Sequence, residues 1–130
     1  MLHRILFCFL LSACLLSCSQ AEEKLSEELQ AKVLGLHDEL MPKTEELMSL
    51  QARLDSLSKG QDSVHVNKLK HALAKSDQAM MDWMHQFSID KLSSMDVQAK
   101  IAYLGKQYDQ LRDLQKLTDS SLHAAKAYHP

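Results

Sequence analysis

Apolar residues recur along most of this chain at alternating steps of four and three. The first series is Leu29, Val33, Leu36, Leu40, Leu47, Leu50, Leu54 and Leu57, with Lys43 as its one polar member. The second is Val66, Leu69, Leu73, Ser76, Met80, Trp83 and Phe87, and the third is Val97, Ile101, Leu104, Tyr108, Leu111, Gln115, Thr118, Leu122 and Ala125. A period near 3.5 residues keeps each series on one face of a helix. The pattern therefore predicts three helices that pack on one another.

The gaps between the series carry signals that end and begin helices. Gly60 suits a left-handed helix cap, Asp62 and Ser63 can cap a second helix, and residues 93–96 resemble a capping box for a third. The predicted helices span residues 22–59, 64–87 and 94–128. Because short connections make neighbouring helices antiparallel, the expected fold is an all-α antiparallel three-helix bundle with long coiled-coil-like helices.

Pro42 falls inside the first predicted helix. A proline there removes one backbone hydrogen bond and clashes with the preceding turn, at a cost of about 3 kcal/mol. The leucine series keeps its phase on both sides of Pro42. The sequence therefore predicts a kink rather than a break, with the carbonyl of Asp38 freed for another partner.

Folding the first two helices about Gly60 pairs positions whose numbers sum to about 122. This places His85 level with His37, and Met81 level with Met41. The third helix is expected to start at this same level, which brings Met95 and Val97 alongside.

In this arrangement residues 22 to about 34 and those after about 118 overhang the bundle. The overhangs carry the apolar positions Leu25, Leu29, Val33, Leu122, Ala125 and Tyr128. A monomer would leave these half exposed, which predicts self-association or a helical protein partner.

The stretch MMDWMHQF (80–87) and the stretch HDELMP (37–42) raise the possibility of a metal site. His37 and Met41 are four residues apart, as are Met81 and His85, so each pair shares a helix face. Thioether and imidazole groups suit Cu(I), and a His/Met pair can also ligate haem. No CxxCH motif is present, so any haem would be bound non-covalently.

Core packing is the alternative explanation for these residues. Met80, Trp83 and Phe87 lie on the second apolar series, and methionine sulfur packs well against aromatic rings. Met81 and His85 lie about 100° away around the helix, where they would face solvent. The main expectation is thus no cofactor, with a Cu(I) or haem site at His37, Met41, Met81 and His85 as the alternative.

The first twenty residues, MLHRILFCFLLSACLLSCSQ, have the layout of a secretory signal. A short basic start precedes an apolar run that is shorter than the roughly 20 residues needed to span a membrane. The end of this run, Leu15-Leu16-Ser17-Cys18, resembles the bacterial lipobox. The resemblance implies a signal peptide over residues 1–17, a lipidated tether over 18–21 that begins at Cys18, and a helical domain over 22–130. An ordinary cleaved signal with a free Cys18 is the alternative.

Lipidation at Cys18 would supply the multiple acyl chains that stable membrane anchoring needs. The other two cysteines leave with the signal, so the mature chain would carry no free thiol for a disulfide, a metal site or a nucleophile. Ser19 follows where many inner-membrane lipoproteins carry Asp. We therefore expect an envelope protein anchored in the outer membrane, on either of its faces.

Charge and composition exclude several classes of function. Without residues 1–17 the chain has 113 residues and 14 Lys and Arg against 17 Asp and Glu, so there is no basic excess to hold phosphates. Aromatic residues make up only 5% of the chain, which also argues against nucleic-acid binding. Since no HExxH motif, serine-nucleophile motif or glycine-rich loop occurs, we expect no enzymatic activity.

The segments HDELMPKTEEL and MMDWMHQF, together with the lipobox, resemble a group of small bacterial envelope lipoproteins of unknown function. Members of that group are sometimes labelled viral A-type inclusion protein. The resemblance brings no activity, partner or cofactor with it. The sequence as a whole favours a lipid-anchored binding or structural module, with a soft-metal or haem carrier as one alternative. A spacer between envelope layers is another, because a 38-residue helix spans about 57 Å.

Overall fold

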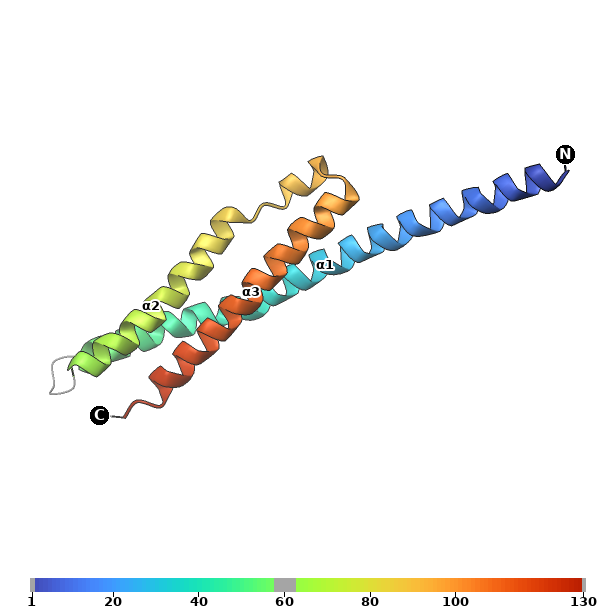
Figure 1. The fold of residues 1–130 in the computed structure, drawn as a ribbon. Coiled ribbons are helices and arrows are strands. Elements are labelled where there is room, and N and C mark those ends of the chain that lie inside the picture. Colours follow the sequence, from blue (N-terminus) through green and yellow to red (C-terminus); the bar gives the residue numbers. More distant parts are fainter. Residues whose placement is uncertain (1, 58–62, 130) are drawn as a thin grey trace.

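Three long helices make up the protein. The structure, a computed structural model, describes the backbone of residues 2–57 and 63–129 and the side chains of 19–56 and 63–129. Its elements are α1 (Leu2–Leu57), α2 (Ser63–Gln86), the short 3-10 helix η1 (Asp90–Ser94) and α3 (Val97–Lys126). Figure 1 shows the three long helices running along one another, with the blue N-terminal part of α1 projecting beyond the other two. The predicted all-α fold of three packed helices is confirmed.

The ends of the helices agree with the predicted ends to within a few residues, except at the start of α1 and the start of α3. Helix α1 begins at Leu2 rather than at residue 22, because the residues before 22 are rich in leucine, which also favours a helix. Helix α3 begins three residues later than predicted, since residues 90–94 first form η1. Asp96 caps α3 by accepting a 2.8 Å hydrogen bond from the backbone N–H of Ala99. The caps predicted at Gly60 and Asp62 lie outside the described residues.

Pro42 lies within α1, and the helix continues on both sides of it. The prediction that the proline would not break the helix is confirmed, and the kink at Pro42 stays a prediction. The side chain of Pro42 is exposed, so the helix carries the proline on its outer surface.

The apolar series form the core, as predicted. The fully or nearly buried apolar side chains fall into two clusters. One holds Val33, Leu40, Met80, Trp83, Leu92, Leu104, Leu111 and Leu114, and the other holds Leu47, Leu54, Val66, Leu69, Leu73, Leu122 and Ala125. Leu29, Leu36 and Phe87 pack against the first cluster and Leu50 against the second.

A buried polar layer separates the two apolar clusters. It consists of Thr44 from α1, Ser76 from α2, and Thr118 and Ser121 from α3. The hydroxyl oxygens of Ser76 and Ser121 lie 2.9 Å apart, and each is also within hydrogen-bonding distance of the Ala72 carbonyl oxygen. Ser121 also donates to the Leu117 carbonyl of its own helix at 2.8 Å, so both hydroxyls have partners within their helices, and the contact between them adds a polar link between α2 and α3.

Helices α1 and α2 are antiparallel in the predicted register. The ring of His37 packs near that of Trp83, and Lys70 forms an ion pair with Asp55. Both contacts join positions whose numbers sum to about 122, as expected.

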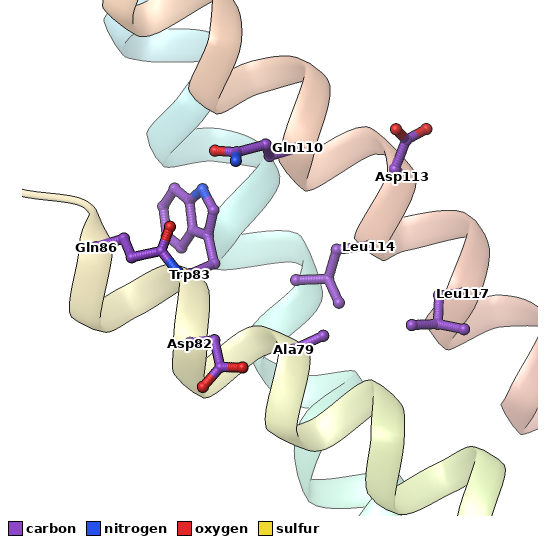
Figure 2. A pocket seen from close by; sticks show the side chains of 8 residues that line it. All are labelled: Ala79, Asp82, Trp83, Gln86, Gln110, Asp113, Leu114 and Leu117. Carbon is purple, nitrogen blue, oxygen red and sulfur yellow. The ribbon is translucent and has the colours of Figure 1, made fainter.

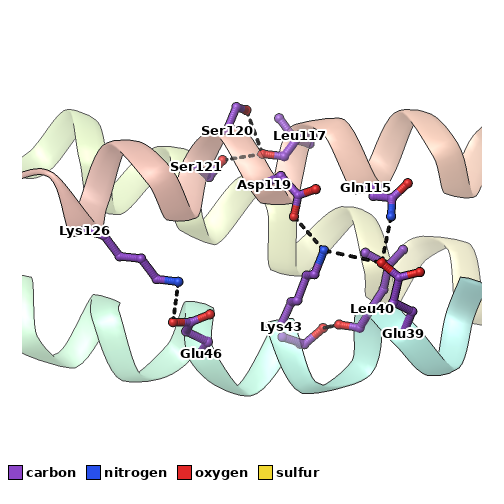
Figure 3. A network of polar contacts seen from close by, with 11 residues as sticks. Glu39, Leu40, Lys43, Glu46, Gln115, Leu117, Asp119, Ser120, Ser121 and Lys126 are labelled. Carbon is purple, nitrogen blue, oxygen red and sulfur yellow. Dashed lines mark hydrogen bonds and ion pairs between the residues drawn. The ribbon is translucent and has the colours of Figure 1, made fainter.

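Helices α1 and α3 run parallel, with contacts between residues about 76 positions apart. Lys43 Nζ lies 2.7 Å from a carboxylate oxygen of Asp119, and Gln115 donates a 3.0 Å hydrogen bond to Glu39 (Figure 3). Two further ion pairs extend this register in both directions, Glu46 with Lys126 and Glu23 with Lys100. Lys43, the one polar member of the first series, is thus held at the α1–α3 boundary.

The predicted level of the third helix was wrong. We expected Met95 and Val97 beside His37 and His85, but Lys100 lies level with Glu23. The segment between α2 and α3 continues past the end of α2 before the chain reverses (Figure 1), and Leu92 of η1 is buried in the core. Helix α3 therefore begins closer to the N-terminal end of α1 than it would if the chain reversed in a tight turn after Phe87.

This register covers most of the apolar positions in the two predicted overhangs. Val33 is buried near one end, and Leu122 and Ala125 are buried near the other, whereas Leu25 is 43% exposed. Intramolecular packing thus covers most of the apolar positions from which self-association was predicted. Any partner has to be argued from a different surface.

Candidate functional site: the Trp83 layer and the methionine face

Trp83 is the centre of an aromatic layer that joins the three helices. Its ring stacks on Phe87 with centroids 4.9 Å apart, and Phe87 stacks in turn on Tyr103 of α3 at 6.2 Å. The ring of His37 from α1 lies 5.6 Å from that of Trp83. Tyr103 also accepts a 3.1 Å hydrogen bond from the backbone N–H of Ser88. This layer fixes the end of α2 against both neighbouring helices.

The stretch 80–87 divides as the apolar pattern predicted. Met80 and Trp83 are buried and Phe87 is half-buried, while Met81 and His85 are exposed. The core interpretation of Met80, Trp83 and Phe87 is therefore confirmed. Met81 and His85 are left on the surface of α2.

The two histidines near this layer bond within their own helices. His37 Nδ1 lies 3.1 Å from a carboxylate oxygen of Asp38, and His85 Nδ1 lies 2.7 Å from the Met81 carbonyl oxygen. A carbonyl oxygen accepts only, so Nδ1 of His85 carries the proton. In neutral His85 the lone pair is therefore on Nε2.

The four predicted ligands lie at the outer side of α1 and α2. His37 is half-buried, and its ring contacts are with Asp38 and Trp83, whereas Met41, Met81 and His85 are exposed. Among the described residues, no three His, Cys, Asp or Glu side chains gather as a metal-binding group. The hollow beside His37 measures about 120 Å³, below the size of typical cofactor sites. The Cu(I) and haem alternative gains no support from this geometry.

A different grouping emerges on the same side of the bundle. The small hollow beside His37 is lined by Leu34, His37, Trp83, Met84 and Phe87. Met41 lies one turn after His37 on α1, and Met81 lies one turn before Met84 on α2. Because α1 and α2 are antiparallel, Met41 and Met81 therefore lie beside each other on the side of the bundle that carries this hollow. Met48 follows Met41 by two turns. We call Met41, Met48, Met81 and Met84 the methionine face.

The methionine face is open to solvent and flanked by acidic residues. Met41, Met48 and Met81 are 37%, 53% and 40% exposed, unusually high for large apolar side chains. Asp38 and Glu45 lie on α1 within one turn of Met41, and Asp77 lies one turn from Met81 on α2. The sequence pattern singled out Met41 and Met81 but not Met48. The signal that could have identified Met48 is its spacing of seven residues from Met41, which places both side chains on one face of the helix.

Comparison with known proteins adds nothing to these contacts. No protein-family model, curated protein or solved structure matches this chain. The function has to be argued from the residues themselves.

Proposed function

We propose that this protein is a lipid-anchored module of the bacterial envelope that binds a helical protein partner through its methionine face. The observation that carries this proposal is the group of exposed methionines on one side of α1 and α2. Methionine side chains are flexible and polarisable, and proteins that bind amphipathic helices use them as adaptable contact surfaces. The small hollow lined by Leu34, His37, Trp83, Met84 and Phe87 lies beside this face, and an amphipathic helix can lay its apolar side on such a surface.

The acidic flanks indicate the chemistry of the partner. Asp38, Glu45 and Asp77 surround the methionines with negative charge. A partner helix with an apolar stripe bordered by lysine or arginine would complement this surface. Two copies of this chain joined through the same face would bring their acidic flanks together, which disfavours a symmetric homodimer.

The proposed anchor is Cys18, at the end of the lipobox-like sequence. Helix α1 is continuous from this position to the methionine face. At 1.5 Å per residue, Met41 lies about 35 Å along the helix from Cys18. Among the described residues, no helix has a run of apolar sequence sufficient to cross a bilayer. Acyl chains on Cys18 are proposed as the means of attachment because of the lipobox-like sequence, with the outer membrane as the location.

Anchoring can be tested on the amino terminus of the mature protein. We expect mass spectrometry to find a chain that begins at Cys18 and carries the added mass of two or three acyl chains. Cys18→Ser should remove this mass and release the protein from the membrane fraction. A wild-type chain with an unmodified Cys18 thiol would contradict the proposal.

Partner binding can be tested with substitutions on the methionine face. Met41→Glu and Met81→Glu each place a charge in the apolar surface, so we expect loss of the partner species in envelope cross-linking. Ala124→Glu, at an exposed position of α3, is the matched control and should leave that species unchanged. Circular dichroism should show equal helix content in all three variants. Persistence of the cross-linked species in both methionine variants would contradict the proposed surface, and a species of twice the chain mass would indicate a homodimer.

A further inference from the structure

The methionine face presents thioether sulfur that a small oxidant can reach. Residues 19–130 contain no cysteine, so methionine supplies all of the sulfur in this part of the chain. Met48 is the most exposed member of the face, followed by Met81 and Met41, and Met84 is half-buried. Because oxidation of sulfur follows its exposure to solvent, an oxidant acts first at the three exposed methionines.

Met80 provides an internal comparison within the same helix. It directly precedes Met81 but is only 2% exposed, since it belongs to the apolar cluster that also holds Trp83 and Leu104. One residue step turns the chain by about 100° around the helix, so the two neighbouring methionines lie in different surroundings. An oxidant in water therefore meets Met81 and not Met80.

The exposed sulfur is confined to one side of α2. On the side that packs against α1, Met84 lines the small hollow beside His37. Figure 2 shows the opposite side, where α2 faces α3 across a second hollow that is lined by Ala79, Leu114 and Leu117 among others and has no methionine in its lining. Oxidation would thus alter the α1–α2 surface and leave the α2–α3 surface unchanged.

We propose that the exposed methionines are a modification site, at which oxidation by hydrogen peroxide to methionine sulfoxide releases the helical partner. The release rests on the proposed function, whereas the order in which the methionines react does not. A lone pair on sulfur attacks one oxygen of the peroxide, so that an S–O bond forms and the O–O bond breaks. The proton of the attached oxygen passes to the departing hydroxide, which leaves as water. Sulfur is oxidised by two electrons and the peroxide is reduced.

A sulfoxide changes what the face can bind. Oxidation turns a flexible apolar side chain into a polar one, and its oxygen keeps water that the apolar stripe of a partner helix would have to displace. The neighbouring acidic residues Asp38, Glu45 and Asp77 offer this oxygen no hydrogen-bond donor, because an ionised carboxylate only accepts. The buried Met80 is shielded, so the bundle keeps its fold while the face loses affinity for the partner.

The modification is chemically reversible. Methionine sulfoxide reductases, one for each sulfoxide epimer, restore the thioether. With a dithiol as reductant the S–O bond breaks, the oxygen leaves as water and the two thiols become a disulfide. The reductant has no other sulfur target in residues 19–130, since these contain no cysteine. The face can therefore pass between an apolar binding state and a polar released state.

Peptide mass spectrometry of the purified protein after graded treatment with hydrogen peroxide tests the modification site. We expect Met41, Met48 and Met81 to be oxidised at least fivefold faster than Met80, with fragment ions separating Met80 from Met81. Circular dichroism should show unchanged helix content while only the exposed methionines have reacted. Oxidation of Met80 as fast as Met81, or loss of helix content in step with the exposed methionines, would overturn the proposal.

Envelope cross-linking of peroxide-treated cells tests the release. The partner species should fall at least fivefold and should return when the extracted envelope is treated with both reductases and dithiothreitol. A variant that combines Met41→Leu, Met48→Leu and Met81→Leu keeps the apolar surface without its sulfur, so it should form the species and retain it in peroxide.

Two results would overturn the release. One is persistence of the partner species when Met41 and Met81 are fully converted to sulfoxides, and the other is an equal loss of the species in the leucine variant. Absence of the species from untreated cells would instead contradict the proposed function and the release with it, while the order of oxidation in the purified protein still decides the modification site.

Discussion

Leu104 illustrates how much single residues contribute to this bundle. It is fully buried in the same apolar cluster as Trp83. Replacing a buried leucine with alanine removes transfer free energy and leaves a cavity, so Leu104→Ala should lower the free energy of unfolding by about 2–5 kcal/mol. Urea denaturation followed by circular dichroism measures this loss.

Leu25→Ala is the matched control for Leu104→Ala. Leu25 is 43% exposed, and its replacement should change stability by less than about 1 kcal/mol. Equal losses in the two variants would contradict the assignment of the core.

At the residue scale the sequence predicted burial well wherever the apolar period was regular. Met80 and Trp83 could be separated from Met81 and His85 because a one-residue step turns the chain about 100° around the helix. Ser121 was missed. It is buried against α2, where its hydroxyl contacts that of Ser76, 45 residues away, and no local pattern contains that information.

Pro42 allows a prediction at the scale of one element. Helix α1 continues through it, and its side chain is exposed. Pro42→Ala would restore a backbone N–H that can bond to the freed carbonyl of Asp38, and little packing would be lost. We expect the free energy of unfolding to rise by about 1–3 kcal/mol. Urea denaturation measures the change, and a loss of stability would mean that the bundle packs around a bend set by the proline.

The order of the helices and most of their ends could be predicted from the sequence, but the start of α1 and the level of α3 could not. The apolar period defines which face of a helix is buried and is unchanged when that helix slides by whole turns. The level is set instead by the segment after α2, where Leu92 of η1 is buried, and by ion pairs such as Lys43 with Asp119. These contacts join positions far apart in sequence, so the prediction placed α3 too far from the start of α1.

At the scale of the whole molecule, the corrected register moves the candidate interface. Most apolar side chains of the segments that were expected to overhang are covered, and the exposed apolar side chains instead include Met41, Met48 and Met81. In the proposed arrangement α1 extends from the lipid anchor at Cys18 to this surface. The protein would then hold a helical partner at a set distance from the membrane, which combines the binding and spacer roles considered for the sequence.

Site-specific photo-cross-linking in intact cells tests this central claim most directly. A photoreactive amino acid would replace Met41 or Met81 in turn, with Asp109 on the exposed surface of α3 as the control position. The account predicts that both methionine positions form an adduct with the same protein and that position 109 does not. Adducts of equal yield at all three positions, or none at positions 41 and 81 in a protein that is folded and membrane-bound, would contradict it.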